Sequence, residues 1–404
     1  MKTLQLSYIL FLIPILIPPI LTYEFNLDEN QTHYNIFFAS FTGSQSHVKG
    51  ILNLGYELQQ VGHKFSLLTT PKRMKWGNKY NITSYSIGKD ESTALFSRVK
   101  KYEEKNSGEF NTDDFFAKDI DELVIKPYEY AFMELKEIVD KENPDLIICD
   151  FISVVCMDIA SILKVPMIIT FQSIDFGNVI INDYISLVSE YDKLSIKEMN
   201  IFDRFYHFFW VKIMKYYYYF PVISKLKAMK NKFNVPFSIA TIKGNFQQGL
   251  IWANTFWGYE IPRYLPPNIQ LIGPIKDALE DTKQVEEVDR FLVDKQKVIY
   301  ISFGTNLILS DIEFNLIYQQ LNQLIKNNLI DGVIWSLTNT KLSDKDNKKE
   351  NNKKENNKSI LFINYLNQPL LLNNNKIILF ITHSGLESIF ESIQSNTPML
   401  NLPF

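Results

Sequence analysis

The chain has 404 residues, of which 46% are hydrophobic and 22% are charged, so it is long enough for two domains with apolar cores and has an ordinary globular composition. Its formal net charge is only −3, which gives no indication of a nucleic-acid partner. It contains two cysteines and no group of residues with metal-ligand spacing, so no metal site is expected.

The N-terminus has the pattern of a secretory signal peptide. Lys2 precedes an apolar run over residues 4–21, and charged residues resume soon afterwards. A retained membrane anchor is the alternative, but Pro18 and Pro19 near the end of the run favour cleavage or a break in the helix. We therefore predict a signal peptide over residues 1–22. The mature protein is expected in the secretory pathway, either in the endoplasmic reticulum lumen with a loose membrane association or secreted.

Three sequences fit the N-glycosylation pattern Asn-X-Ser/Thr, and they begin at Asn30, Asn81 and Asn357. The pattern is common by chance, but in a protein that enters the secretory pathway such a site is an acceptor for glycosylation. We expect glycans at Asn30 or Asn81.

The first half of the chain is predicted to form a parallel sheet covered by helices. Apolar runs predict strands over residues 34–39, 64–69, 145–150 and 167–170. Helical spacing of apolar residues predicts a helix over residues 48–61 and another that ends at residue 163. Because strands joined by a helix run in the same direction, this order implies a parallel sheet. Residues 23–273 are therefore interpreted as a Rossmann-like domain.

The two cysteines lie close together in this domain. Cys149 belongs to a predicted buried strand, and Cys156 lies early in the next helix. A disulfide and a reduced pair in the core are both compatible with this placement.

Residues 183–232 are predicted to be helical and are rich in aromatic side chains. The runs Phe208-Phe209-Trp210 and Tyr216-Tyr217-Tyr218-Tyr219-Phe220 stand beside lysines. Two interpretations stay open: a helix that packs over an acceptor pocket, and a surface that dips into a membrane interface, where Tyr, Trp and Lys are stable. The second interpretation adds a membrane surface to the expected partners.

A domain boundary is predicted near Gly273-Pro274, where prolines and an acidic stretch interrupt the pattern. Residues 274–290 are predicted as a linker and residues 291–404 as a second domain. Its pattern predicts strands over residues 298–305 and 333–337, with a helix around 314–325 between them. Residues 344–359 have only polar and charged side chains and are predicted to be a disordered, low-complexity insertion, with a basic binding loop as the alternative.

Near the C-terminus, an apolar strand over residues 377–382 runs into His383-Ser384-Gly385 and then into a helical segment that carries Glu391. A small-residue turn between a strand and a helix binds phosphate groups, because the first N–H groups of the helix lack intrahelical partners and the helix dipole favours an anion. His383 adds a donor, and a carboxylate further along accepts hydrogen bonds from sugar hydroxyls. The combination indicates a nucleotide-sugar diphosphate more than a bare anion.

This segment resembles the signature of the UDP-glycosyltransferases, the broad family of the UDP-glucuronosyltransferases. The resemblance is carried by Phe380-Ile381-Thr382-His383-Ser384-Gly385, Ser388, Glu391, Thr397-Pro398-Met399 and Pro403. Tyr365-Leu366-Asn367-Gln368 stands where the family has Trp-X-Pro-Gln. The resemblance implies the α/β fold named GT-B, in which two Rossmann-like domains face each other across a cleft. The first domain would bind the acceptor and the second the UDP-sugar.

His47 and Asp150 are the candidate catalytic residues. His47 follows the first strand and Asp150 ends a later one, so both lie at the carboxyl edge of the predicted sheet. Transfer to a hydroxyl needs a base near the acceptor, and the base needs a carboxylate to stabilise its charged form. Both positions match the catalytic His-Asp dyad of the family. The alternative is that each residue only caps a helix.

The resemblance also implies the roles of the donor-binding residues. At the diphosphate end, His383, the N–H groups around Gly385 and the hydroxyl of Ser388 would hold phosphate, and Thr305 would touch a phosphate or the base. At the nucleoside end, Gln368 and Glu391 would bind the ribose, and Tyr365 would stack on uracil in place of the family's Trp.

The implied function is inverting transfer of a hexosyl group, glucose or glucuronate, from a UDP-sugar to a small lipophilic acceptor such as a sterol, phenol or lipid. No metal or other cofactor is expected, because the helix terminus and His383 would carry the diphosphate charge. The family's Asp-Gln pair does not appear before Phe404, so the second domain is expected to be incomplete and the protein truncated at its C-terminus. The alternative is a non-catalytic paralogue that binds a lipophile or acts as a partner subunit, in homo- or hetero-oligomers with full-length relatives.

Overall fold

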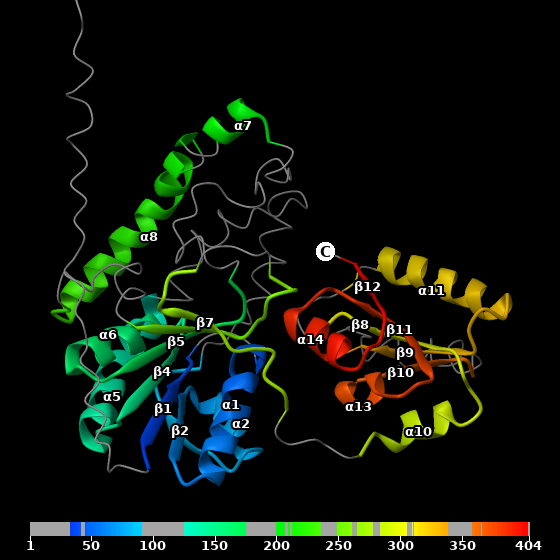
Figure 1. The fold of residues 1–404 in the computed structure, drawn as a ribbon, viewed down its shortest axis with the longest axis horizontal. Helices are drawn as coiled ribbons and strands as arrows, with labels where there is room; N and C mark the ends of the chain where they lie inside the picture. The colour runs from blue at the N-terminus through cyan, green and yellow to red at the C-terminus, as the bar shows by residue number, and fades with distance from the viewer. Residues whose placement is uncertain are drawn as a thin grey trace, which may run out of the picture. The chain divides into compact units, whose positions relative to one another are not determined.

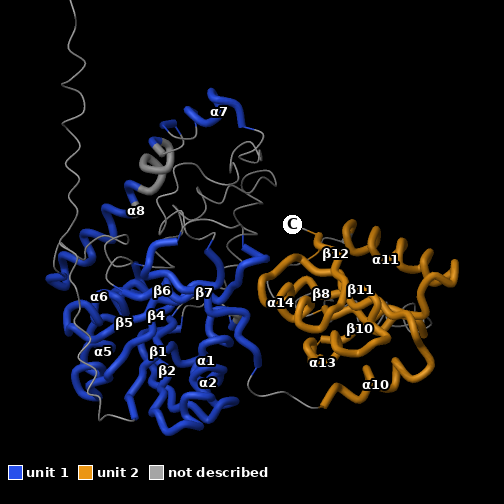
Figure 2. The backbone as a smooth tube through the Cα atoms, in the orientation of Figure 1, with its two compact units in different colours: residues 1–92, 101–278 blue, residues 93–100, 279–404 orange. Residues whose placement is uncertain are grey.

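The structure is a computed structural model of the protein. It describes residues 33–41, 45–90, 125–174, 199–206, 209–210, 212–235, 249–260, 265–277, 283–304, 309, 311–337, 358–364 and 366–402. The described residues divide into two compact units after residue 278, here called unit 1 and unit 2 (Figure 2). The sequence placed the boundary near Gly273-Pro274, slightly earlier than this division.

The described strands of unit 1 form a seven-stranded sheet in the order β3-β2-β1-β4-β5-β6-β7, with all neighbours parallel (Figure 1). The strands are β1 (Asn35–Ala39), β2 (Lys64–Thr69), β3 (Thr83–Ser86), β4 (Leu146–Asp150), β5 (Met167–Phe171), β6 (Leu250–Ala253) and β7 (Ile269–Leu271). The helices are α1 (Gln45–Gln60), α2 (Lys75–Asn78), α5 (Lys126–Glu142), α6 (Val154–Leu163), α7 (Ile201–Tyr206) and α8 (Lys212–Lys232), with a short 3-10 helix η1 (Pro71–Arg73). The predicted parallel Rossmann-like sheet is confirmed.

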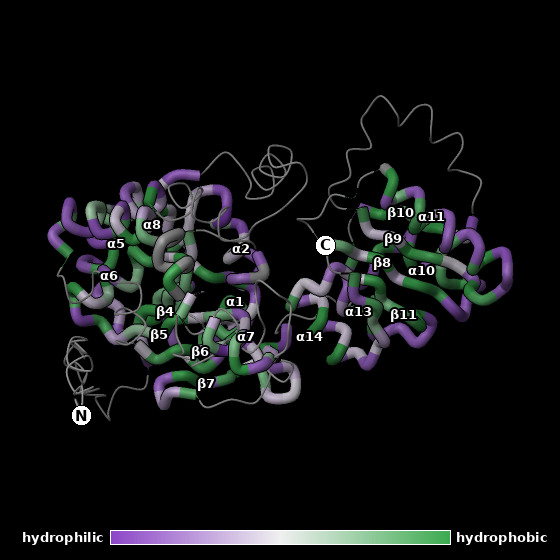
Figure 3. Tube along the Cα trace, turned by 90° about the horizontal axis from the view of Figure 1, so that it is seen from above, coloured by the Kyte–Doolittle hydropathy of each residue, from purple (hydrophilic) through white to green (hydrophobic). Residues whose placement is uncertain are grey.

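The core of unit 1 lies where helices cover this sheet. The inner strands are nearly continuous runs of buried apolar residues, as expected for parallel strands that are covered on both faces. Of these strands, β4 and β5 are labelled in Figure 3 and carry the hydrophobic colour along much of their length. Burial of these runs is the main favourable term in folding.

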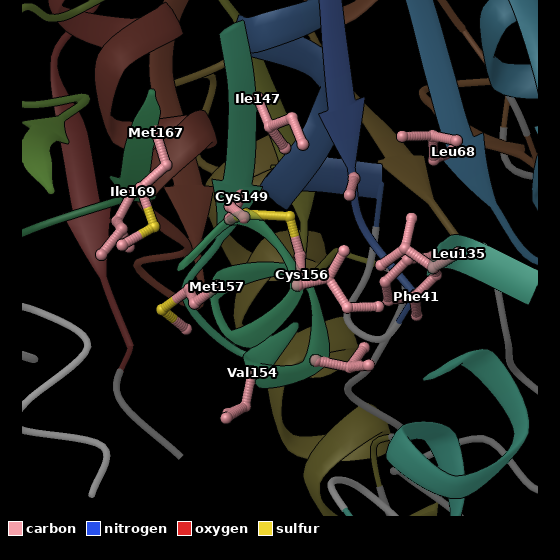
Figure 4. Close-up of a cluster of buried hydrophobic side chains, with 14 of the residues drawn as sticks. Phe41, Leu68, Leu135, Ile147, Cys149, Val154, Cys156, Met157, Met167 and Ile169 are labelled. Atoms are coloured by element: carbon pink, nitrogen blue, oxygen red, sulfur yellow. A yellow bond between two sulfur atoms is a disulfide. The ribbon is translucent and has the colours of Figure 1, made fainter. Parts of the chain in front are cut away.

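A disulfide joins Cys149 at the end of β4 to Cys156 in α6, within this core (Figure 4). Both residues are buried among apolar side chains. Of the two arrangements that the sequence allowed, the structure has the disulfide.

A buried polar cluster fixes the end of α8 to the helices beside it. The ammonium of Lys230 lies 2.9 Å from Asp158 on α6, and both side chains are inaccessible to solvent. Tyr128 on α5 donates a 2.7 Å hydrogen bond to the same carboxylate. Burial lowers the pKa of Lys230 and raises that of Tyr128, while Asp158 opposes the shift of Lys230. Because removing one partner would leave a buried charge, the cluster ties α8 to α5 and α6.

The predicted aromatic helical segment appears as α7 and α8, and residues 183–198 lie outside the described residues. Large apolar side chains along it are exposed: Ile201, Phe202, Phe205, Tyr206, Phe209, Trp210, Ile213, Phe220 and Ile223. Among the described side chains of α8, burial begins only at Leu226, near the buried cluster. Among the described residues, no helix is both long and apolar enough to cross a membrane.

The described strands of unit 2 form a five-stranded parallel sheet in the order β10-β9-β8-β11-β12. The strands are β8 (Val298–Ser302), β9 (Gly332–Ser336), β10 (Ile360–Ile363), β11 (Ile377–Thr382) and β12 (Met399–Asn401). The helices are α10 (Glu286–Leu292), α11 (Asp311–Lys326), α13 (Gln368–Leu372) and α14 (Leu386–Gln394). Apolar clusters cover both faces of the sheet.

The predicted linker over residues 274–290 overlaps α10, whose Val288 and Leu292 are buried in the core of unit 2. Its first turn carries three acidic residues, which suit the positive end of the helix dipole, so the last residues of the predicted linker begin a helix. Most of the predicted insertion over residues 344–359 lies outside the described residues.

Candidate functional site

The carboxyl edge of the sheet in unit 1 brings three polar side chains together. Strands β1 and β4 are neighbours, with Ala39 opposite Cys149, so the residues that follow them meet. Ser40 donates a 2.9 Å hydrogen bond to Oδ2 of Asp150, which is 1% exposed. Nδ1 of His47, in the first turn of α1, lies 3.5 Å from Oδ1 of the same carboxylate. The predicted His-Asp pair is thus in contact, with Ser40 as a partner that the sequence did not reveal.

The environment of His47 favours its protonated form. Burial lowers the pKa of His47 and nearby Arg73 lowers it further, but the hydrogen bond and charge of Asp150 outweigh both, so the pKa of His47 is raised above 6.5. An imidazole held this way accepts a proton and keeps the resulting charge stabilised.

Two further residues hold His47 in place. The ring of Phe151 stacks on the imidazole with centroids 5.7 Å apart and an interplanar angle of 16°. Gln172, just after β5, donates a 3.1 Å hydrogen bond from Nε2 to the backbone carbonyl of His47. The ring and the helix turn that carries it are therefore both supported.

In unit 2, His383 lies in a space made by two glycines. Strands β8 and β11 are parallel neighbours with Ser302 opposite Thr382, so Gly304 and His383 follow them at the same edge. A Cβ atom at Gly304 would lie 2.6 Å from the imidazole ring, and one at Gly385 would lie 2.7 Å from it. Gly304 also has a φ of +70°, a conformation that glycine adopts without strain. Glycine is thus required at both places for the ring to lie where it does.

His383 has the features of a neutral donor to a ligand. Burial lowers the pKa of His383, so the imidazole favours its neutral form. Its Nδ1 is buried and has no hydrogen-bond partner among the described residues. The ring stands directly before α14, whose N-cap Gly385 supplies no side-chain cap. A phosphate at this helix N-terminus would suit the helix dipole, and the neutral imidazole beside it has one ring N–H to donate.

A hydrogen-bonded network joins three of the predicted donor-binding residues. Nε2 of Gln368, the first residue of α13, donates to Oε2 of Glu391 at 2.7 Å and to Oγ of Ser388 at 3.2 Å, both on α14. Its Oε1 accepts a 2.8 Å hydrogen bond from the hydroxyl of Tyr300 on β8. Because a carboxylate only accepts, the amide of Gln368 must face Glu391 with its NH₂ group.

Tyr300 is a residue that the sequence analysis did not identify. It is 1% exposed and stacks on Phe380 with ring centroids 4.9 Å apart. Burial raises the pKa of Tyr300 well above 10, so the phenol keeps its proton and donates to Gln368. In the sequence Tyr300 is one residue of an apolar strand, and nothing in that pattern separates it from the core.

Two predicted site residues, Thr305 and Tyr365, lie outside the described residues. The other seven are described, and they form two sets: His47 with Asp150 in unit 1, and Gln368, His383, Gly385, Ser388 and Glu391 in unit 2. Among the described residues, no group of three or more His, Cys, Asp and Glu side chains is placed to hold a metal ion.

Two parallel Rossmann-like sheets in one chain are the architecture of the GT-B class of glycosyltransferase fold. Solved structures agree: the protein aligns with Arabidopsis thaliana UGT89C1 complexed with quercetin at a TM-score of 0.55 and 12% identity, over 92% of this chain and 79% of that one. It aligns with Phytolacca americana UGT2 complexed with UDP-2fluoro-glucose and pterostilbene at a TM-score of 0.54 and 13% identity, over 93% and 81%.

The family model "UDP-glucoronosyl and UDP-glucosyl transferase" matches residues 38–404, so the chain belongs to this family. It is 27% identical to UDP-glycosyltransferase 1 of Phaeomoniella chlamydospora over 277 residues, 67% of this chain and 55% of that protein. It is 24% identical to human UDP-glucuronosyltransferase 3A1 over 293 residues, 66% and 50% of the two proteins. The matches thus span about half the length of these curated relatives.

Proposed function

We propose that the protein transfers a hexosyl group, glucose or glucuronate, from a UDP-sugar to a hydroxyl of a small lipophilic acceptor, with inversion at the anomeric carbon. The observation that carries the proposal is the network of Gln368, Ser388 and Glu391, which joins α13 to the helix that follows His383, in a chain that belongs to the family. These groups suit a ribose and a diphosphate.

In the proposed reaction, neutral His47 removes the proton of the acceptor hydroxyl while the acceptor oxygen attacks the anomeric carbon. The bond from that carbon to the diphosphate oxygen breaks, and UDP leaves with the electron pair. Asp150 stabilises the imidazolium that forms, as the raised pKa of His47 indicates. One displacement at one carbon inverts its configuration.

The diphosphate charge is balanced without a metal ion in this proposal. The N-terminal N–H groups of α14 and the imidazole of His383 face the leaving group. The reaction should therefore persist in EDTA, and loss of activity that Mg²⁺ restores would contradict this part of the proposal.

The acceptor is proposed to be a sterol, phenol or lipid. The aromatic side chains exposed on α7 and α8 support this class, since they suit apolar molecules and the interface of a membrane. We also propose a secretory-pathway location with loose membrane association, supported by the apolar run over residues 4–21. Carbonate at high pH should release the expressed protein from membranes, and retention after carbonate would contradict a cleaved signal peptide.

Isothermal titration with UDP and an assay of UDP release test the function. Wild-type protein should bind UDP, and His383→Ala should lose most of that affinity. UDP-glucose or UDP-glucuronate with a panel of phenols and sterols should release UDP, and His47→Ala should not support release while still binding UDP. Equal turnover by wild type and His47→Ala would overturn the role of the dyad. Lipophile binding without UDP binding would instead favour a non-catalytic paralogue or partner subunit.

A further inference from the structure

Gln284 makes an unusual set of contacts with the segment that leads into α13. Its Nε2 donates a 2.8 Å hydrogen bond to the carbonyl of Asn367, and its Oε1 accepts a 3.0 Å hydrogen bond from the N–H of the same residue. The same Oε1 also accepts a 2.9 Å hydrogen bond from the N–H of Val285. One side-chain amide thus hydrogen-bonds to both the N–H and the C=O of Asn367, as the backbone of a neighbouring strand does in a sheet.

Residue 367 is one of the positions at which this protein departs from the Trp-X-Pro-Gln signature that the segment resembles, which has proline there. Proline has no N–H, so it could not donate to Gln284. Asn367 also acts as N-cap of α13, because its Oδ1 accepts a 3.2 Å hydrogen bond from the N–H of Leu370. The departure therefore adds two hydrogen bonds at the start of α13 that proline could not make.

The next residue after Asn367 is Gln368, whose side chain joins Tyr300, Ser388 and Glu391. Val285 and Leu366, beside the two bonded residues, pack in the same apolar cluster of unit 2. The backbone that carries Gln368 is thus held by hydrogen bonds from Gln284 and by burial of Leu366. From this backbone position the amide of Gln368 reaches Ser388 and Glu391.

We propose that Gln284 is a positioning residue for UDP binding, which it supports by fixing the backbone of Asn367 and thereby the side chain of Gln368. The inference rests on the proposed function, because it takes Gln368 and Glu391 as the ribose-binding pair. Gln284 touches no ligand in this proposal.

A double-mutant cycle read by UDP titration tests the inference. Gln284→Ala should weaken UDP binding about fivefold, since it removes hydrogen bonds worth a few-fold each. It should raise the KM for UDP-sugar and leave kcat and the melting temperature near those of wild type. Gln320→Ala, a change of an exposed glutamine on α11, is the matched control and should leave the UDP affinity unchanged.

The second arm uses Asn367→Pro, which removes the N–H that donates to Gln284. In this background, Gln284→Ala should weaken UDP binding by only about twofold, because one of the bonds is already lost. Asn367→Ala keeps the N–H and removes only the cap, so Gln284→Ala should retain its full effect there.

Three results would overturn the inference, and they differ from failure of the proposed function. UDP binding that is equal in wild type and Gln284→Ala would do so, as would an undiminished effect of Gln284→Ala in the Asn367→Pro background. A Gln284→Ala protein whose affinity falls only as its melting temperature falls would show a structural role alone. Absence of UDP binding by wild type would overturn the proposed function together with this inference.

Discussion

The polar edges of the two units are built in different ways. In unit 1 one hydroxyl supports the hydrogen-bonded pair of His47 and Asp150, and the carboxylate raises the pKa of the imidazole. In unit 2 the amide of Gln368 stands at the centre of a network, and the imidazole of His383 has a lowered pKa. The first arrangement suits proton transfer and the second suits the recognition of hydroxyl and phosphate groups. Changes in unit 1 should therefore act on turnover and pH dependence, and changes in unit 2 on UDP affinity.

Asp150→Asn should have the largest effect and lower kcat by about 10³-fold, within the range that general-base catalysis supplies. The base must be neutral to act, so wild-type activity falls as pH drops through the pKa of His47. Asp150 raises that pKa, so its loss should move the acid limb of the kcat/KM profile to lower pH. UDP affinity should be unchanged. An acid limb that stays in place would show that Asp150 does not tune His47.

Gly385→Ala should weaken UDP binding about 20-fold, which corresponds to a free-energy cost within the range found for overpacked sites. The added methyl would lie 2.7 Å from the His383 ring and would displace it, while the φ of −58° at residue 385 excludes backbone strain as the cause. Titration with UDP measures the loss. In a His383→Ala background the same change should cost nothing further, and an equal loss there would argue against a clash with the ring.

Ser40→Ala should lower kcat about tenfold, because a hydrogen bond to a charged acceptor is worth more than one to a neutral group. Its hydroxyl bonds to Oδ2 of Asp150 at 2.9 Å. The matched control is Ser66→Ala on β2, a buried serine whose hydroxyl has no hydrogen-bond partner among the described residues. Steady-state rates that fall equally in both variants would mean that Ser40 only fills space.

Tyr300→Phe should have the smallest effect, a loss of about threefold in UDP affinity, since its hydroxyl bonds to a neutral amide. The ring remains, so stacking on Phe380 is kept. Tyr318→Phe on α11, which changes a hydroxyl outside the network, is the control. If Tyr300→Phe weakened UDP binding more than Gly385→Ala, orientation of Gln368 would matter more than placement of His383.

The sequence predicted the parts of this molecule that depend on local pattern. The strands at Lys64–Thr69 and Ile377–Thr382 begin and end as expected, because each is an apolar run between polar residues or turns. Strands β6 and β7, with four and three residues, are too short to show a pattern, and β7 lies among prolines. Strand β6 joins the sheet by pairing with β5, which lies far away in the sequence, and β7 pairs with β6, so a local pattern does not encode their place in the sheet.

In the candidate site too, the residues that follow a local sequence pattern were predicted, and those that depend on distant contacts were not. His47, Asp150 and His383 follow or end predicted strands, which is where ligands bind in such sheets. Tyr300 and Gln284 were missed, because one resembles a core residue of a strand and the other lies in an acidic stretch that resembles a linker. The roles proposed for them rest on hydrogen bonds with residues 68 and 83 positions away in the sequence.

The buried cluster of Lys230, Asp158 and Tyr128 anchors the end of α8, so the part of the helix before it can be exchanged in a chimera. Among the described side chains, those that fix this helix to the sheet domain lie in its last turns, from Leu226 onward, whereas Phe220 and Ile223 before them are exposed. A chimera that replaces the segment from α7 to residue 225 with the equivalent segment of a relative would keep this buried cluster and Leu226 unchanged. Such an exchange would test whether this segment carries the proposed preference for a membrane or an acceptor, because it leaves His47 and Asp150 unchanged.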